Sequence, residues 1–123
     1  MALKIRVDEG RAQAKTLVLD GRLDQDSVDA LDAQLDAVLA SGVKVLVFDL
    51  AKLEYIASAG LRSIFRAHKA LSARGGKSAL LNAQPQVRKV FEIVKVADAS
   101  IFRSVTELDD YLDAIQKKVA GGD

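Results

Sequence analysis

Apolar and charged residues alternate at the start of the chain, which predicts a strand hairpin. Leu3, Ile5 and Val7 are separated by charged residues, the period-two pattern of a half-buried strand near a sheet edge. A second strand is expected over residues 16–19, ended by Asp20-Gly21. Because the gap between the two strands is too short for a crossover helix, we expect them to pair antiparallel.

From residue 24 onwards, segments whose apolar residues recur at helical spacing alternate with short, continuous apolar runs. The pattern predicts a first helix that the segment 24–27 opens and that ends just before Gly42. Further helices are expected over about 59–74, from Pro85 and from Ser104. Strands are expected over 43–48, 78–82 and 99–102. The first of these is a nearly unbroken, β-branched apolar run, which is typical of a strand covered on both faces and indicates the centre of the sheet. The inner stripe of the second helix is expected to comprise Leu61, Ile64, Phe65, His68 and Leu71.

These elements predict a fold of the α/β class. We expect one domain over residues 1–123, with 1–2 and 120–123 frayed. Its central mixed sheet has four to five strands, an antiparallel hairpin followed by mostly parallel strands, with about four helices.

Composition narrows the function classes. Half of the 123 residues are hydrophobic and 28% are charged, with a net charge of +1 and no basic block, which argues against nucleic acid as a partner. Cysteine is absent, so disulfides and thiolate chemistry are excluded. The chain has one histidine, His68. Four aspartates on the first predicted helix are interpreted as a solvated face, so we expect no metal and no cofactor: Asp26, Asp29, Asp32 and Asp36. No apolar run is long enough to enter a membrane, and we expect a cytoplasmic location.

Ser58 is the residue with the clearest chemical possibilities. It lies where the exit loop of the central strand meets the next helix. Its hydroxyl could cap that helix, a contribution of about 0.5–2 kcal/mol. It could also accept a phosphoryl group, which the free N–H groups and positive dipole end of the helix would stabilise. The small residues Ala59 and Gly60 leave the serine open to a large enzyme, and the two interpretations are compatible.

Two motifs around this serine resemble a known family. The segment from Leu53 to Arg62 reads Leu-Glu-Tyr-Ile-Ala-Ser-Ala-Gly-Leu-Arg. It resembles the signature of STAS domains of the anti-sigma-factor antagonist type, usually Asp-Ser-Ser-Gly-Leu or Asp-Ser-Thr-Gly-Leu. The segment from Gly21 to Asp24 resembles the family's Gly-x-Leu-Asp motif. With the matching order of elements, the resemblance covers essentially the whole chain. Ala57 replaces the usual aspartate, and Ala59 replaces the second Ser or Thr.

The resemblance implies a protein-binding switch rather than an enzyme. In that family the unphosphorylated antagonist binds an anti-sigma-factor serine kinase of the histidine-kinase-like ATPase type and thereby frees a sigma factor. The kinase phosphorylates the serine at the position of Ser58, and a metal-dependent Ser/Thr phosphatase restores it. The aspartate at the position of Asp24 lies near that serine. The docking surface implied here comprises Asp24, Ala57, Ser58, Ala59, Gly60 and Arg62.

The same residues are open to other interpretations. Some STAS domains are subunits of lipid-transport ABC systems that dock on the ATPase without phosphorylation, and others bind kinases that control secretion or biofilm formation; Ala57 and Ala59 leave both open. Gly60 could serve close packing alone, and Arg62 could be an ordinary solvated helix residue.

Two enzyme-like interpretations are disfavoured. A serine hydrolase would need a base beside Ser58, but His68 is ten residues along the same predicted helix, a rise of about 15 Å. A phospho-aspartate receiver using Asp8 and Asp49 would need a helix between its first two strands, where the chain has no room for one.

Overall fold

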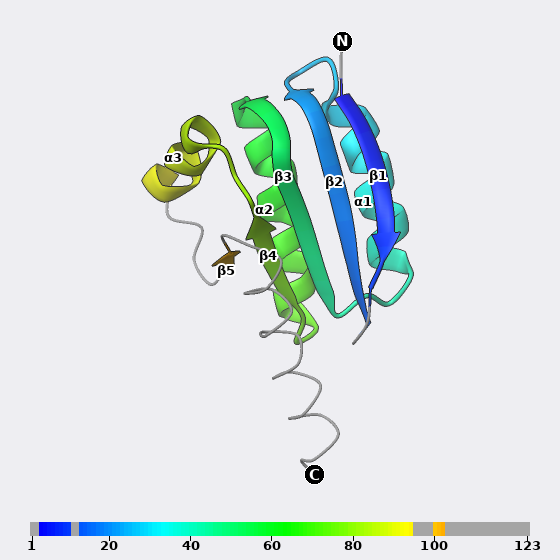
Figure 1. Cartoon of the computed structure of the whole chain (residues 1–123). Coiled ribbons are helices and arrows are strands. Elements are labelled where there is room, and N and C mark those ends of the chain that lie inside the picture. The colour runs from blue at the N-terminus through cyan, green and yellow to red at the C-terminus, as the bar shows by residue number, and fades with distance from the viewer. Residues whose placement is uncertain (1–2, 11–12, 95–99, 103–123) are drawn as a thin grey trace.

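The chain folds as a five-stranded sheet with helices packed against it (Figure 1). The computed structural model describes residues 3–10, 13–94 and 100–102. The strands lie in the order β1-β2-β3-β4-β5; β1 and β2 are antiparallel and the other pairs are parallel. Helices α1 and α2 lie behind the sheet in Figure 1, and α3 lies beyond β4. The elements are β1 (Leu3–Glu9), β2 (Ala14–Leu23), α1 (Val28–Ala40), β3 (Val45–Ile56), α2 (Ser58–Ala73), β4 (Lys77–Leu81), α3 (Pro85–Val94) and β5 (Ser100–Phe102).

The predicted α/β class, the antiparallel hairpin and the central position of the third strand are confirmed. The fold has five strands, and three helices fall within the described residues. The helix expected from Ser104 lies outside the described residues, as do the two ends that we expect to be frayed. The third helix begins at Pro85, where proline's fixed backbone angle and missing N–H suit the first helical position.

The predicted end of the second strand at Asp20-Gly21 is wrong. The register between β2 and β3 shifts between Val18 and Asp20 and again between Gly21 and Arg22, so the strand bends and continues to Leu23. Gly21 has a φ of 119°, which a residue with a side chain rarely adopts. β3 likewise runs on to Ile56. Both strands are therefore longer than predicted, and their last residues, Leu23 and Ile56, are paired.

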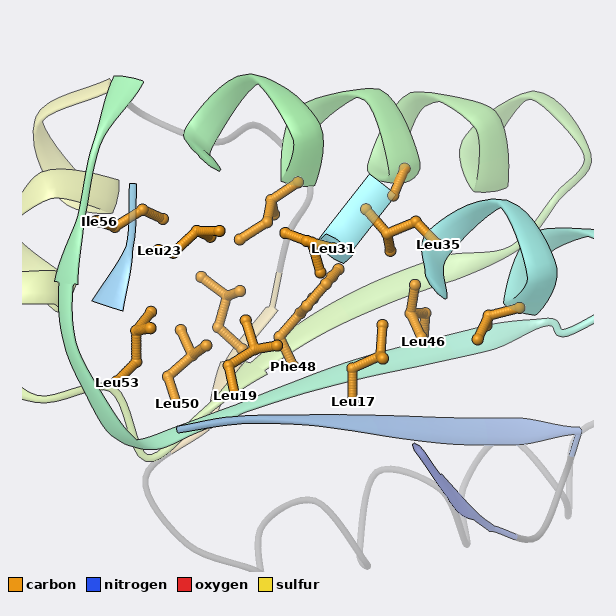
Figure 2. Packing of buried hydrophobic residues seen from close by; sticks show 14 of the residues in the cluster. Leu17, Leu19, Leu23, Leu31, Leu35, Leu46, Phe48, Leu50, Leu53 and Ile56 are labelled. Atoms are coloured by element: carbon orange, nitrogen blue, oxygen red, sulfur yellow. The ribbon is translucent and has the colours of Figure 1, made fainter. Parts of the chain in front are cut away.

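The core lies between the sheet and helices α1 and α2 (Figure 2). Leu46 and Phe48 of β3 belong to this cluster with Leu31 and Leu35 of α1. A separate buried cluster contains the alternate β3 residues Val45 and Val47 with Ala14, Ala79 and Leu81. Successive residues of a strand point to opposite faces, so β3 is buried on both sides, as its apolar run indicates.

The inner stripe of α2 differs from the expectation. Leu61, Phe65 and His68 are only partly buried, whereas Ile64 and Leu71 are fully buried as expected. The rest of the stripe is made by small residues, namely Gly60, Ser63 and Ala67. Small side chains carry little apolar signal in a sequence, so these buried positions were not predicted.

Candidate functional site

The two motif segments lie side by side at one end of the sheet. In the parallel β2–β3 pair, Arg22 is opposite Tyr55 and Leu23 is opposite Ile56. The N–H of Ala57 then donates a hydrogen bond of 2.8 Å to the carbonyl of Leu23. Asp24 and Ser58 each follow one residue beyond this bond. The structure therefore brings the segments that contain them together, although they are far apart in the sequence.

Ala57, not Ser58, is the N-cap of α2. Its backbone is extended, with φ −95° and ψ 169°, and its carbonyl accepts the first helical hydrogen bond from the N–H of Leu61 at 3.0 Å. The interpretation of Ser58 as the capping residue is therefore wrong, because the chain enters the helix one residue earlier. A methyl side chain accepts no hydrogen bond, and α2 has no side-chain cap.

Ser58 is thus the first residue of the helix, and its side chain is exposed. The N–H groups of Ser58, Ala59 and Gly60 precede the first helical hydrogen bond, so the helix itself gives them no acceptor. The first turn of α2 also contains no acidic residue. The start of α2 therefore combines an accessible hydroxyl with a positive, uncapped helix end.

Gly60 fixes how closely this helix start approaches β2. A Cβ atom at position 60 would lie 2.5 Å from Cγ and 2.6 Å from Cδ2 of Leu23, a fully buried side chain. Real Cβ atoms do not approach other atoms so closely. Gly60 is itself buried, so it places the Ser58 segment against the sheet rather than offering a side chain to a partner.

Asp24 organises the turn that leads into α1. One oxygen, Oδ1, accepts hydrogen bonds from the N–H of Asp26 at 3.0 Å and from the N–H of Ser27 at 3.2 Å. The buried hydroxyl of Ser27 donates to the carbonyl of Arg22 at 2.9 Å and accepts from the N–H of Asp24 at 3.0 Å. These bonds hold the turn beside the Ser58 segment in one conformation.

A pocket of about 280 Å³ lies between α1 and α2, next to the helix start. It is lined by Val28, Asp32, Ala59, Arg62, Ser63 and Arg66. Arg66 bonds Asp32 at 3.0 Å and Asp36 at 3.3 Å. Hydrogen bonds to Asp32 and then to Asp36 raise the pKa of Arg66 above its ordinary value. Two aspartates of the predicted solvated face are thus paired across the two helices.

Sequence reasoning missed one feature of this end of the sheet. Tyr55 is the exposed large hydrophobic side chain of the described residues, with 42% of its surface accessible, and the guanidinium of Arg22 lies 4.3 Å from its ring centre. The pair follows from the register between β2 and β3, which depends on the strand irregularity before Arg22. The signal in the sequence was the tyrosine within the motif segment, three residues before Ser58.

His68, further along α2, has a structural partner on β4. Its Nδ1 atom is hydrogen-bonded to the hydroxyl of Ser78, a buried residue of β4, at 2.5 Å. His68 lies ten residues along the helix from Ser58, so the pair needed for a nucleophilic serine is not assembled.

The fold and this site define a class: a small α/β domain that presents a serine at an exposed junction of strand and helix. The STAS domain model matches residues 6–108, and the chain belongs to the STAS domain family. Among the described residues, none of the helices has the length and apolar character needed to cross a membrane.

Several relatives are named for regulation of sigma factors. The chain is 39% identical over 75 residues to BtrV of Bordetella bronchiseptica, named as a candidate anti-sigma factor antagonist, with 61% of this chain and 65% of the relative covered. It is 32% identical over 75 residues to the anti-sigma F factor antagonist of Lysinibacillus sphaericus, with 60% and 64% covered. The chain thus matches just under two-thirds of the length of these curated relatives.

Solved structures share the fold. An anti-sigma factor antagonist from Mycobacterium paratuberculosis superposes with a TM-score of 0.76 at 22% identity, covering 93% of this chain and 94% of the other. The Bacillus protein SpoIIAA in its phosphorylated form gives 0.73 at 21% identity, covering 89% and 99%. At these identities the likeness concerns the fold.

Proposed function

We propose that this chain is an anti-sigma factor antagonist, a binding protein rather than an enzyme. In this proposal it binds an anti-sigma-factor serine kinase while Ser58 is unmodified and releases the kinase once Ser58 carries a phosphate. The names of the relatives support the regulatory class. The observation that carries the proposal is the exposed Ser58 at the uncapped start of α2.

A phosphate at this position is compatible with the fold. Phosphoryl transfer from ATP would form a bond between Ser58 Oγ and phosphorus, release the hydroxyl proton and leave ADP. The added group carries a charge of about −1.5 to −2 and strong acceptor oxygens. The uncapped N–H groups of the first turn and the positive helix end are suited to receive it. Phosphorylation would therefore change the surface without breaking the helix.

The docking surface in this proposal is the Ser58 segment and the exposed side of α2. Ser58 and Arg62 are exposed, Ala57 and Ala59 are half-buried, and Asp24 holds the neighbouring turn. A new dianion at the centre of such a surface would oppose a partner fitted to the neutral serine. Ala57 places no further negative charge beside it.

The partners proposed are a serine kinase of the histidine-kinase-like ATPase type and a metal-dependent Ser/Thr phosphatase that restores Ser58. Because the kinase needs ATP, we place the complex in the cytoplasm. The relatives named above are antagonists, which favours this function over that of a lipid-transport subunit. The shared fold also supports the switch, since SpoIIAA has been solved in a phosphorylated form.

Affinity capture from the source organism tests this function. The baits are the wild-type chain, Ser58→Ala and Ser58→Asp, with mass spectrometry of the captured proteins. We expect wild type and Ser58→Ala to retain a histidine-kinase-like ATPase, and Ser58→Asp to lose at least tenfold of it, because the carboxylate places negative charge at the contact.

Ala70→Asp is the matched control, since it adds the same charge to an exposed position about 18 Å further along α2. It should bind as wild type does. Absence of such a kinase from every bait, or equal capture by Ser58→Asp, would overturn the proposed function.

A further inference from the structure

Two arginines line the pocket between α1 and α2, and Arg62 is the one that forms no ion pair within the described residues. The other arginine of the pocket, Arg66, is engaged by Asp32 and Asp36 at 3.0 and 3.3 Å. Arg62 is exposed, and within the described part of the chain it forms no ion pair. Its guanidinium is therefore available for a new anion beside it.

Ser58 and Arg62 are placed to interact. They stand four residues apart in one continuous helix, α2, and side chains with this spacing lie next to each other, with Cβ atoms about 6 Å apart. The order is also favourable, because an anion four residues before a cation agrees with the helix dipole. The neighbouring first-turn residues, Ala59 and Gly60, are small and uncharged.

Local charges make Arg62 the natural counter-ion of an anion at position 58. The first turn of α2 contains no acidic residue, and the N-cap is an alanine. Arg62 thus lies close to a positive helix end without a compensating carboxylate in that turn, an arrangement that is electrostatically unfavourable until an anion arrives. Asp32, the carboxylate of the pocket, is already bonded to Arg66.

We propose that Arg62 is the internal phosphate-binding residue of the switch: it forms an ion pair with phosphoserine at position 58 and leaves the pocket between α1 and α2. This inference rests on the proposed function and specifies its regulation. Phosphorylation would then act twice on the docking surface. It would add a dianion, and it would withdraw from the pocket the one lining cation that Asp32 and Asp36 do not already engage.

The experiment installs phosphoserine at position 58 during translation, so that no kinase is needed. Phosphorus NMR then follows the second ionisation of the phosphate with pH, at low salt, in the wild-type background and in Arg62→Gln, Arg62→Lys and Lys69→Gln. A neighbouring guanidinium favours the dianion, so the pKa of the phosphate should be lower in wild type. We expect Arg62→Gln to raise it by about 0.3 unit or more, Arg62→Lys to raise it less, and 1 M salt to shrink the difference.

Lys69→Gln removes the same charge from an exposed position further along the helix and should leave the phosphate pKa unchanged. Equal values in wild type and Arg62→Gln, or an equal shift in Lys69→Gln, would overturn the ion pair. Because the phosphate is installed without a kinase, this result is independent of whether cells modify Ser58. Failure of the proposed function would appear separately, in the capture experiment.

Discussion

At the scale of single residues, Ala57 leaves the first N–H groups of α2 without a side-chain acceptor. Its backbone has the extended conformation of an N-cap, but its methyl group cannot accept the N–H groups that follow. The family signature usually has an aspartate at this position, and an aspartate at an N-cap would accept such a hydrogen bond. In this chain those donors remain available to another acceptor, and the nearest residue that could acquire one is Ser58.

We predict that Ala57→Asp stabilises the domain. The new carboxylate would cap α2 and lie at its positive end, so the free energy of unfolding should rise by about 0.5–2 kcal/mol. Urea denaturation at neutral pH measures the difference. Ala59→Asp is the control, because it brings the same charge to the first turn without the N-cap position. An equal gain in both variants, or none in Ala57→Asp, would contradict the capping role of position 57.

At the scale of elements, α2 is attached to the sheet at two points along its length. Near its start, Gly60 sits against Leu23 of β2. Ten residues beyond Ser58, His68 is hydrogen-bonded to Ser78 of β4. These contacts fix the helix relative to two different strands, so Ser58 is held on a rigid support rather than on a loose loop.

We predict that Gly60→Ala destabilises the domain, although alanine is the better helix former by about 1 kcal/mol. The added Cβ would overlap the buried Leu23 side chain, so the net loss should be about 1–3 kcal/mol in a denaturation experiment. Combining it with Leu23→Ala makes room, and the double variant should lose less than the sum of the two single ones. Strict additivity would show that the contact with Leu23 is not the cause.

The sequence predicted those elements whose periodicity was unambiguous. The alternation in β1 and the apolar run of β3 indicated the hairpin and the central strand, and Pro85 marked the start of α3. The end of β2 was missed because Asp20-Gly21, a usual turn signal, lies at a strand irregularity instead. Such a shift depends on the neighbouring strand and leaves little mark in the local sequence.

The candidate site was predictable in position and less so in its details. The family resemblance implied that Asp24 lies near Ser58, and the β2–β3 register brings the segments that contain them together. The predicted capping residue, Ser58, was wrong by one position, because the start of a helix depends on backbone angles that the sequence does not specify directly. The Arg22–Tyr55 contact and the pairing of Arg66 with α1 join residues distant in the sequence, so they required the fold.

At the scale of the whole molecule, the fold is a stable platform that presents Ser58 on one surface. Helix α2 packs against one face of the sheet on the same side as α1, as Figure 1 shows, and its first residue, Ser58, is exposed at the end of β3. A phosphate there alters charge more than structure. The change in binding is therefore expected to come from electrostatics at the contact and not from unfolding of the domain.

The central claim is that Ser58 is the phosphorylated residue and that its phosphate ends partner binding. The most direct measurement adds ATP to the complex of the chain with its captured kinase and follows both the site of modification and the amount of complex, for wild type and Ser58→Ala. We predict one phosphate per wild-type chain, on Ser58, with dissociation of the modified chain, and no modification and no dissociation for Ser58→Ala. A phosphate on another residue, or a phosphorylated chain that stays bound as tightly as before, would contradict the account.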